Sequence, residues 1–263
     1  MVEEGESSRK RWTRRDWIKA GVMTGTAAVA GVATGLVSYP LLLPAPKQPQ
    51  GIIEDRIVYT RFPNYDTWWN GKAGETVRVT DFQLWQGATA VWRGLFDGGT
   101  YVPGSGYPVL VIRIVSDDTY FHPPDAAPYG LPTGFDLFYD DPVRGIRIVV
   151  LFDRCSHLCC TPGWHRTDTE TPGRDYTAFG VYPPDPPTYI VYGQDPVYCP
   201  CHGAQFDPLL LFSYVNPRTG APFVGARVVH GPGDFGMPVV PVRGVGDDLV
   251  GGMADPRWYE AFC

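Results

Sequence analysis

DRCSHLCC, residues 153–160, and VYCPCHGAQFDP, residues 197–208, contain most of the metal-binding side chains of this sequence. We call them the first loop and the second loop. Together they hold five of the six cysteines and two of the five histidines. The first loop offers Cys155 and His157, and the second offers Cys199 and His202. Thiolates and imidazoles paired in this way predict a metal centre shared by two loops.

The spacing of these ligands excludes several common sites. A structural zinc site usually combines C-x-x-C with H-x-x-x-H, and neither pattern occurs here. Covalent haem attachment needs C-x-x-C-H, and the C-P-C-H of residues 199–202 is one residue too short. A Cys₄ iron–sulfur cluster needs four thiolates close together, whereas this pattern supplies histidines as well.

The rest of the sequence, from about residue 53 onward, predicts an all-β head. The chain has 263 residues, of which 31 are glycine and 27 are proline, and this composition suits short strands joined by many turns. Several runs alternate apolar and polar residues, which favours an antiparallel sandwich or a barrel-like domain. The net charge of −6 provides no basic surface for nucleic acid. The expected strands are 56–62, 75–82, 108–116, 145–152, 188–193, 223–230 and 237–245.

The first 19 residues are typical of an export signal. They contain six basic and four acidic residues, and TRRDWIK, residues 13–19, places Arg14 and Arg15 before an aromatic and an aliphatic residue. This stretch resembles the twin-arginine signal, which exports proteins that have already folded. A generic basic flank before an apolar segment is the alternative interpretation.

An uncharged run of 24 residues, 20–43, follows this signal. About 20 apolar residues suffice to span a bilayer, and the basic residues before the run predict a cytoplasmic N-terminus. Cleavage as a signal peptide is the alternative, but we expect an uncleaved single-pass anchor because the following sequence stays apolar. Residues 44–52 are rich in proline and predict a hinge. The hinge would carry a head, residues 53–263, outside the cytoplasm of a bacterial or archaeal cell.

The two loops resemble the cluster-binding boxes of the Rieske iron–sulfur proteins. C-S-H-L-C-C at 155–160 and C-P-C-H-G-A at 199–204 are similar to the family patterns C-x-H-x-G-C and C-P-C-H-G-S. The resemblance covers about a dozen residues, and the anchor, hinge and β-rich head extend it. It implies a Rieske-type sandwich with a small cluster-binding subdomain at about residues 153–208. It implies one [2Fe–2S] cluster, in which one iron has two cysteine ligands and the other has two histidine ligands. The implied ligands are Cys155, Cys199, His157 and His202.

The resemblance also implies a disulfide between Cys160 and Cys201 that joins the two loops. A disulfide fits an exported protein. Cys159 stands where the family usually has glycine, and the only other remaining cysteine is Cys263. We expect either a second disulfide between Cys159 and Cys263 or two free thiols.

A third segment extends the resemblance. HGPGDFGMPVVPV, residues 230–242, is similar to the Gly-Pro loop of the family, which packs over the cluster. The residues concerned are Gly231, Pro232 and Gly233. The stretch between the first loop and the second loop is longer than is usual in respiratory members, and we expect it to reshape docking with a partner.

Two departures from the family bear on the reduction potential. Ala204 and Phe206 stand where high-potential members have serine and tyrosine. Those hydroxyls donate hydrogen bonds to cluster or ligand sulfur, and such bonds stabilise the reduced, more negative cluster. We therefore expect a low-to-middle potential for the class, suited to a menaquinone-type quinol pool.

The resemblance implies an electron-transfer role. An imidazole on ferric iron loses its second proton more easily and regains it on reduction, so the oxidised centre takes an electron and a proton from quinol. We expect the redox subunit of a quinol:cytochrome c-type oxidoreductase of the cytochrome bc kind, which is not an enzyme on its own. The expected partners are a cytochrome b-type membrane subunit, quinol at His202 or His157, a cytochrome c or copper acceptor, and membrane lipid.

Two other functions stay open from the sequence. The chain could be the small Rieske subunit of an arsenite-oxidase-type molybdenum oxidoreductase, in which the electron comes from molybdenum. It could also be a zinc-stabilised surface binding module without a redox role. Ring-hydroxylating Rieske oxygenases are disfavoured because they normally lack the disulfide cysteines.

Overall fold

The computed structural model describes residues 51–61, 66–164, 188–194 and 196–259. The export signal (1–19), the anchor (20–43), most of the hinge and Cys263 lie outside the described residues. Within the part of the chain that the structure describes, no helix combines the length and the apolar character needed to cross a membrane.

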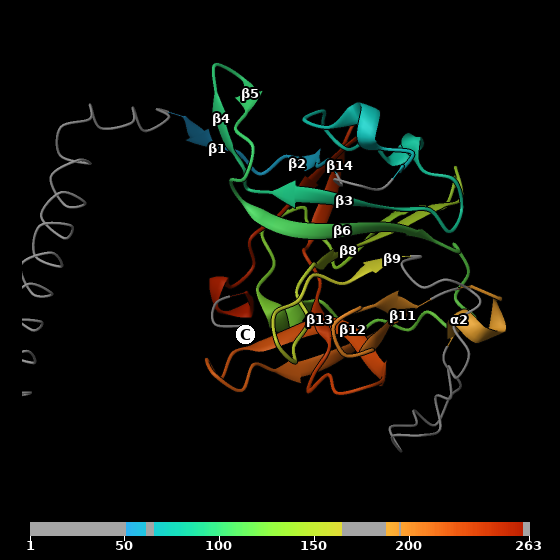
Figure 1. Ribbon diagram of the computed structural model, residues 1–263. Coiled ribbons are helices and arrows are strands. Elements are labelled where there is room, and N and C mark those ends of the chain that lie inside the picture. Colours follow the sequence, from blue (N-terminus) through green and yellow to red (C-terminus); the bar gives the residue numbers. More distant parts are fainter. Residues whose placement is uncertain (1–50, 62–65, 165–187, 195, 260–263) are drawn as a thin grey trace, which may run out of the picture. The chain divides into compact units, whose positions relative to one another are not determined.

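The first of two five-stranded sheets, which we call the base sheet, has the strand order β2-β3-β6-β8-β7, with every pair antiparallel (Figure 1). The central strand β8 is buried along its whole length, and β6 is buried along most of its length. Near-continuous apolar runs of this kind are typical of strands covered on both faces. The strands are β2 (Ile57–Tyr59), β3 (Gly87–Trp92), β6 (Tyr107–Ile114), β7 (Tyr139–Asp141) and β8 (Ile146–Phe152).

The second five-stranded sheet, which we call the loop sheet, has the order β13-β12-β11-β10-β9 and is also antiparallel throughout. It carries both loops: the first loop leads from β8 to β9, and the second loop turns from β10 into β11. Irregular pairing near Gln205 and between Asp207 and Leu211 marks β-bulges in β11. The strands are β9 (Gly163–Trp164), β10 (Val197–Tyr198), β11 (Gln205–Val215), β12 (Pro222–His230) and β13 (Met237–Pro238).

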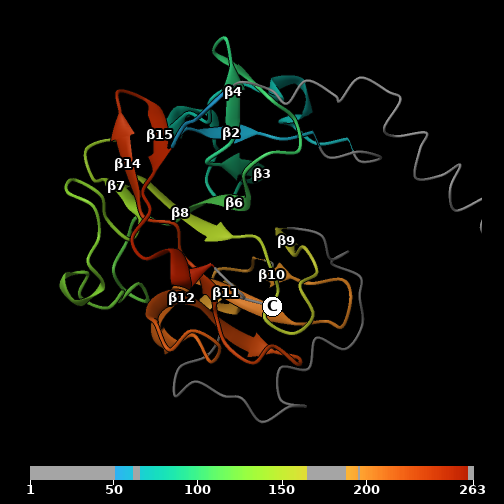
Figure 2. The ribbon, with the colours of Figure 1, turned by 90° about the vertical axis from the view of Figure 1, so that its left-hand side faces the viewer.

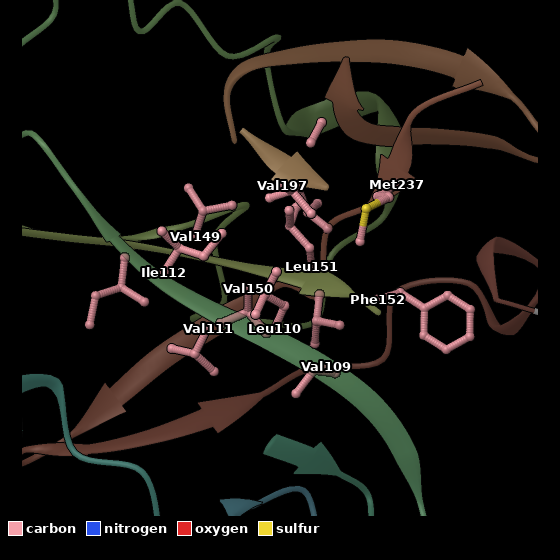
Figure 3. Packing of buried hydrophobic residues seen from close by; sticks show 14 of the residues in the cluster. Val109, Leu110, Val111, Ile112, Val149, Val150, Leu151, Phe152, Val197 and Met237 are labelled. Carbon is pink, nitrogen blue, oxygen red and sulfur yellow. The ribbon is translucent and has the colours of Figure 1, made fainter. Parts of the chain in front are cut away.

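The two sheets share one hydrophobic core. Figure 3 shows side chains of β6 and β8 together with Val197 and Met237 of the loop sheet, all members of one buried cluster. Trp164 packs on Gly87 of the base sheet, where an added Cβ would lie 3.0 Å from the tryptophan side chain. Its Nε1–H donates to the carbonyl oxygen of Trp85 at 2.9 Å. These contacts hold the loop sheet against the base sheet, and Figures 1 and 2 show the two stacked in both views.

Smaller elements complete the head. One three-stranded sheet has the order β1-β4-β5, and β14 pairs with β15 as a hairpin. The described helices are short: α2 has four residues and each 3₁₀ helix has three. The strands are β1 (Ile52–Ile53), β4 (Leu95–Asp97), β5 (Thr100–Tyr101), β14 (Val242–Val245) and β15 (Asp248–Gly251). The helices are α2 (Thr188–Val191), η1 (Asn70–Lys72), η2 (Val79–Asp81), η3 (Ala127–Tyr129) and η4 (Pro256–Trp258).

The antiparallel all-β head predicted from the sequence is confirmed, but two expected strands are wrong. Residues 188–193 begin as helix α2, because the buried carboxylate of Asp207 accepts hydrogen bonds from the N–H and hydroxyl of Thr188 at 2.6 and 2.7 Å. An acceptor at this place acts as a helix cap. Gly193, with φ of 63°, then turns the chain away. Residues 75–82 form bridges to β2 and β15 and then the turn η2, so they belong to no named strand.

Candidate metal centre

Cys155 and Cys199, the two cysteines predicted as ligands, are buried free thiols in hydrogen-bonding contact. This hydrogen bond is the largest influence on both groups. It lowers the pKa of the Cys199 thiol and, together with burial, raises the pKa of the Cys155 thiol. The pair therefore tends to keep one proton between two sulfurs. A metal ion that binds both sulfurs would displace that proton.

Backbone amides surround both sulfurs in the same way. In each loop, the N–H groups of the second and third residues after the cysteine lie against its sulfur and favour the thiolate. The donors are His157 and Leu158 for Cys155, and Cys201 and His202 for Cys199. Both sulfurs are therefore prepared by the main chain to carry negative charge.

The backbones of the two loops close with matching hydrogen bonds. In each loop the cysteine N–H donates to the carbonyl oxygen five residues later, at 2.9 Å in the first loop and 2.8 Å in the second. The carbonyl oxygen of the same cysteine accepts from the N–H four residues later, at 3.0 Å in both loops. The residues involved are Cys155, Cys159 and Cys160 in the first loop, and Cys199, Gly203 and Ala204 in the second. The two loops are thus local copies of one another.

The two predicted histidine ligands also meet. The ring centroids of His157 and His202 lie 4.8 Å apart, and the rings are close to perpendicular at 84°. His202 is exposed and His157 is half-buried. Among the described residues, the buried Nδ1 of His157 has no hydrogen-bond partner. An unpaired buried imidazole nitrogen is costly, and a metal ion bound there would remove the cost.

A disulfide links the first loop to the second loop. The structure joins Cys160 to Cys201, the pairing that the family resemblance implies, with the Cα atoms 6.5 Å apart and a sequence separation of 41. The sulfurs of Cys160, Cys199 and Cys201 lie within 4.8 Å of one another. Because two of them form the disulfide, only Cys199 of this group offers a thiolate. The disulfide therefore lies directly beside the pair of free thiols.

The fifth described cysteine is also oxidised. Cys159 is disulfide-bonded, and its side chain is at an exposed position of the first loop. Its expected partner, Cys263, lies outside the described residues. The pairing of these two residues therefore stays a prediction.

The Gly-Pro loop packs against both loops. A Cβ on Gly231 would lie 2.7 Å from the carbonyl oxygen of Gly203 and 2.8 Å from the Cα of Ala204. Gly231 also has φ of 79°, which favours glycine. A Cβ on Gly233 would lie 3.4 Å from the hydroxyl of Ser156. Pro232 between them is exposed.

Ser156 is a site residue that the sequence interpretation does not predict. Its hydroxyl donates to the carbonyl oxygen of Phe235 at 2.7 Å, and the N–H of Phe235 lies 3.4 Å from the same oxygen. This side chain links the first loop to the segment after the Gly-Pro loop. The sequence offers one signal for this role: Ser156 stands between two predicted ligands, Cys155 and His157, so its side chain lies close to the site or to the segment that packs against it.

The two predicted tuning positions are fully buried: Ala204 directly precedes β11 and Phe206 is its second residue. Ala204 and Phe206 both have 0% of their surface exposed, and neither carries a hydroxyl group. The carbonyl oxygen of Ala204 accepts the hydrogen bond from Cys199 N–H. Neither side chain can therefore donate a hydrogen bond to the sulfur of Cys199, the predicted ligand.

The donor set fits a [2Fe–2S] group with mixed ligands. Two thiols with converging amide donors meet at one place, and two imidazoles, one with an unpaired nitrogen, meet at another. Soft thiolates and imidazoles together suit iron–sulfur centres and zinc better than magnesium or calcium. The residues of this chain could therefore hold such a cluster.

Elsewhere in the described part of the chain, the histidines and the cleft offer no comparable group of metal-binding side chains. Of the remaining histidines, His122 is exposed, His230 pairs with Gln205 at the edge of the site, and His165 lies outside the described residues. One cleft, of about 590 Å³, lies beside the β4–β5 hairpin and is lined by residues such as Tyr59, Tyr101 and Pro103, with no cysteine or histidine among the described residues that line it. We place the functional site at the two loops because the reactive groups converge there.

The sequence was also compared with known proteins. A scan against protein-family models gives no match, and a search of curated proteins gives none at the level searched. The functional interpretation therefore depends on the residues and geometry of the two loops.

Proposed function

We propose that the two loops hold a Rieske-type [2Fe–2S] cluster, with Cys155 and Cys199 on one iron and His157 and His202 on the other. The observation that carries this proposal is the meeting of two free thiols and two imidazoles from matched loops beside one disulfide. Two histidines in place of two cysteines raise the potential of such a centre, to about −150 to +300 mV across the class.

The protein is then an electron-transfer subunit of a membrane quinol-oxidising complex of the cytochrome bc kind. The cluster supplies a site that accepts one electron at a time. His202 is the exposed imidazole, so it is the residue that would hydrogen-bond a quinol hydroxyl and accept its proton. His157 is half-buried and would mainly hold and orient the centre. A cytochrome c or copper acceptor would take the electron onward.

The membrane anchor at 20–43 and the twin-arginine signal complete this proposal. A disulfide beside the ligands suits a head outside the cytoplasm. Export of a folded protein would allow the cluster to be loaded before the head crosses the membrane. The buried Ala204 and Phe206 favour a low-to-middle potential and a menaquinone-type quinol.

Purification of the full-length chain from mildly solubilised native membranes tests the function. We expect co-purification of b-type haem, together with non-haem iron and labile sulfide in equal amounts, and quinol-dependent reduction of a c-type cytochrome. Molybdenum in place of b-type haem would indicate the arsenite-oxidase-type alternative. Zinc with neither iron nor sulfide would overturn the redox proposal and favour a zinc-stabilised binding module.

A further inference from the structure

The first loop contains a non-glycine residue in a left-handed backbone conformation. Cys159 has φ of 61°, and only Trp85 and Arg93 share this property among the non-glycine residues that the structure describes. A Cβ in this region clashes with its own backbone, which is why glycine usually occupies it. The first loop therefore has a strained backbone position two residues after the proposed ligand His157.

The second loop has the same turn at the corresponding position. Gly203 has φ of 78°, and its N–H donates to Cys199 as the N–H of Cys159 donates to Cys155. A Cβ at Gly203 would find only the Tyr198 hydroxyl, at 4.0 Å. There is therefore room for a side chain at Gly203. The closure of the loop, rather than crowding, requires the left-handed backbone conformation at this position.

Cys159 differs from Gly203 in being covalently held. It is disulfide-bonded, although its side chain is exposed. A disulfide restricts the backbone conformations that its cysteines can adopt. The disulfide of Cys159 thus restrains the strained residue of the first loop. The second loop has glycine at the corresponding position and no disulfide at that residue.

We propose that Cys159 is a positioning residue whose disulfide holds the left-handed turn of the first loop. That turn directs the N–H groups of His157 and Leu158 toward the sulfur of Cys155 and sets the direction of the His157 ring. Gly203 performs the same task in the second loop through its conformational freedom alone. The part of the proposal that concerns His157 as a ligand rests on the proposed function, whereas the holding of the turn does not.

Amide hydrogen exchange on the full-length chain tests the inference, with the variants Cys159→Gly and Cys159→Ala. Glycine loses the disulfide but tolerates the turn, whereas alanine loses the disulfide and keeps the strain. We expect first-loop amides to exchange at least about tenfold faster than wild type in Cys159→Ala, and at least about threefold slower in Cys159→Gly than in Cys159→Ala. The matched variant Gly203→Ala should speed exchange in the second loop.

Two results would overturn the inference. Wild-type exchange in Cys159→Ala would show that the disulfide does not hold the turn. Equal exchange in the glycine and alanine variants would show that the left-handed conformation is not what it holds. Iron and sulfide contents of the same samples test the cluster separately, because the order of the exchange rates is expected with or without bound iron.

Discussion

His157 and His202 belong to different loops, yet their ring centroids lie 4.8 Å apart at an angle of 84°. Rings this close together are what the binding of one metal ion by two imidazoles requires. Neither loop could create it alone, because each contributes only one histidine. The proposed role of these rings leads to the first prediction.

Replacing His202 with alanine should lower the bound iron of the purified protein by more than about tenfold, because one iron loses a ligand that solvent cannot replace. The iron content and the visible absorption of the cluster measure this. His122→Ala is the matched control, since His122 is an exposed histidine of the same head. Full iron content in the His202 variant would remove His202 from the ligand set.

The disulfide between the loops should contribute strongly to stability. For a loop of 41 residues, the chain-entropy model gives about 4 kcal/mol at 25 °C. The double variant Cys160→Ala, Cys201→Ala should therefore unfold at a lower denaturant concentration by a corresponding amount. The wild type is the comparison, with and without a reducing agent. A midpoint unchanged from the oxidised wild type would mean that the disulfide adds nothing to the stability of the head.

Ser156 should stabilise the site through its hydrogen bond to Phe235. Ser156→Ala leaves a part-buried carbonyl oxygen without this donor, which costs about 1–3 kcal/mol. We expect a lower unfolding midpoint and faster loss of the cluster signal on storage. Ser156→Thr keeps the hydroxyl and should restore most of the stability. If the wild type and Ser156→Ala unfold at the same midpoint, the hydrogen bond between the first loop and Phe235 does not contribute to stability.

Hydroxyl groups at the two tuning positions should raise the reduction potential. Ala204→Ser and Phe206→Tyr place donors near cluster or ligand sulfur, and such hydrogen bonds favour the reduced state. Redox titration of each variant measures the shift, which we expect to be positive for both. Ala88→Ser introduces a hydroxyl at a buried position of the base sheet and should leave the potential unchanged. A negative shift in either variant would contradict the tuning role.

Acid should destabilise the head partly through one surface ion-pair network. Arg144 contacts Asp141 at 2.6 Å and Asp247 at 2.7 Å, and its hydrogen bonds lower the pKa of both carboxyl groups. A lowered pKa in the folded state stabilises the fold above the unfolded pKa of about 3.9, and this contribution disappears as the pH falls further.

Arg144→Gln should therefore lower stability at pH 7 and reduce the loss of stability between pH 5 and pH 2. Denaturant unfolding at several pH values measures both effects. Arg218→Gln, at an exposed arginine in the turn between β11 and β12, is the control. A variant that loses stability equally at all pH values would exclude the carboxylates as the cause.

Much of the fold could be predicted because the decisive signals are local. The apolar runs of β6 and β8 and the abundance of glycine and proline predict buried antiparallel strands. Residues 188–193 also look like a strand, but the cap that makes them helical comes from Asp207, which is distant in sequence. Local propensity cannot report such a tertiary partner.

The residues of the candidate site could be predicted from their spacing, but the contacts that hold the two loops in place could not. The cysteine and histidine positions, together with the family resemblance they carry, predict the disulfide between Cys160 and Cys201, which the structure confirms. The metal ligands stay a prediction. The contact of Ser156 with Phe235 and the left-handed backbone of Cys159 depend on how distant segments pack and how the loop closes. These features become visible only in three dimensions.

An EPR-monitored redox titration of the full-length protein at several pH values tests the central claim most directly. We predict a Rieske-type signal whose midpoint potential lies in the low-to-middle part of the class and falls as the pH rises above neutrality, because oxidation releases protons from the histidine ligands. The absence of any such signal in iron-loaded protein, or a potential that does not depend on pH, would contradict the proposed histidine-ligated, proton-coupled cluster.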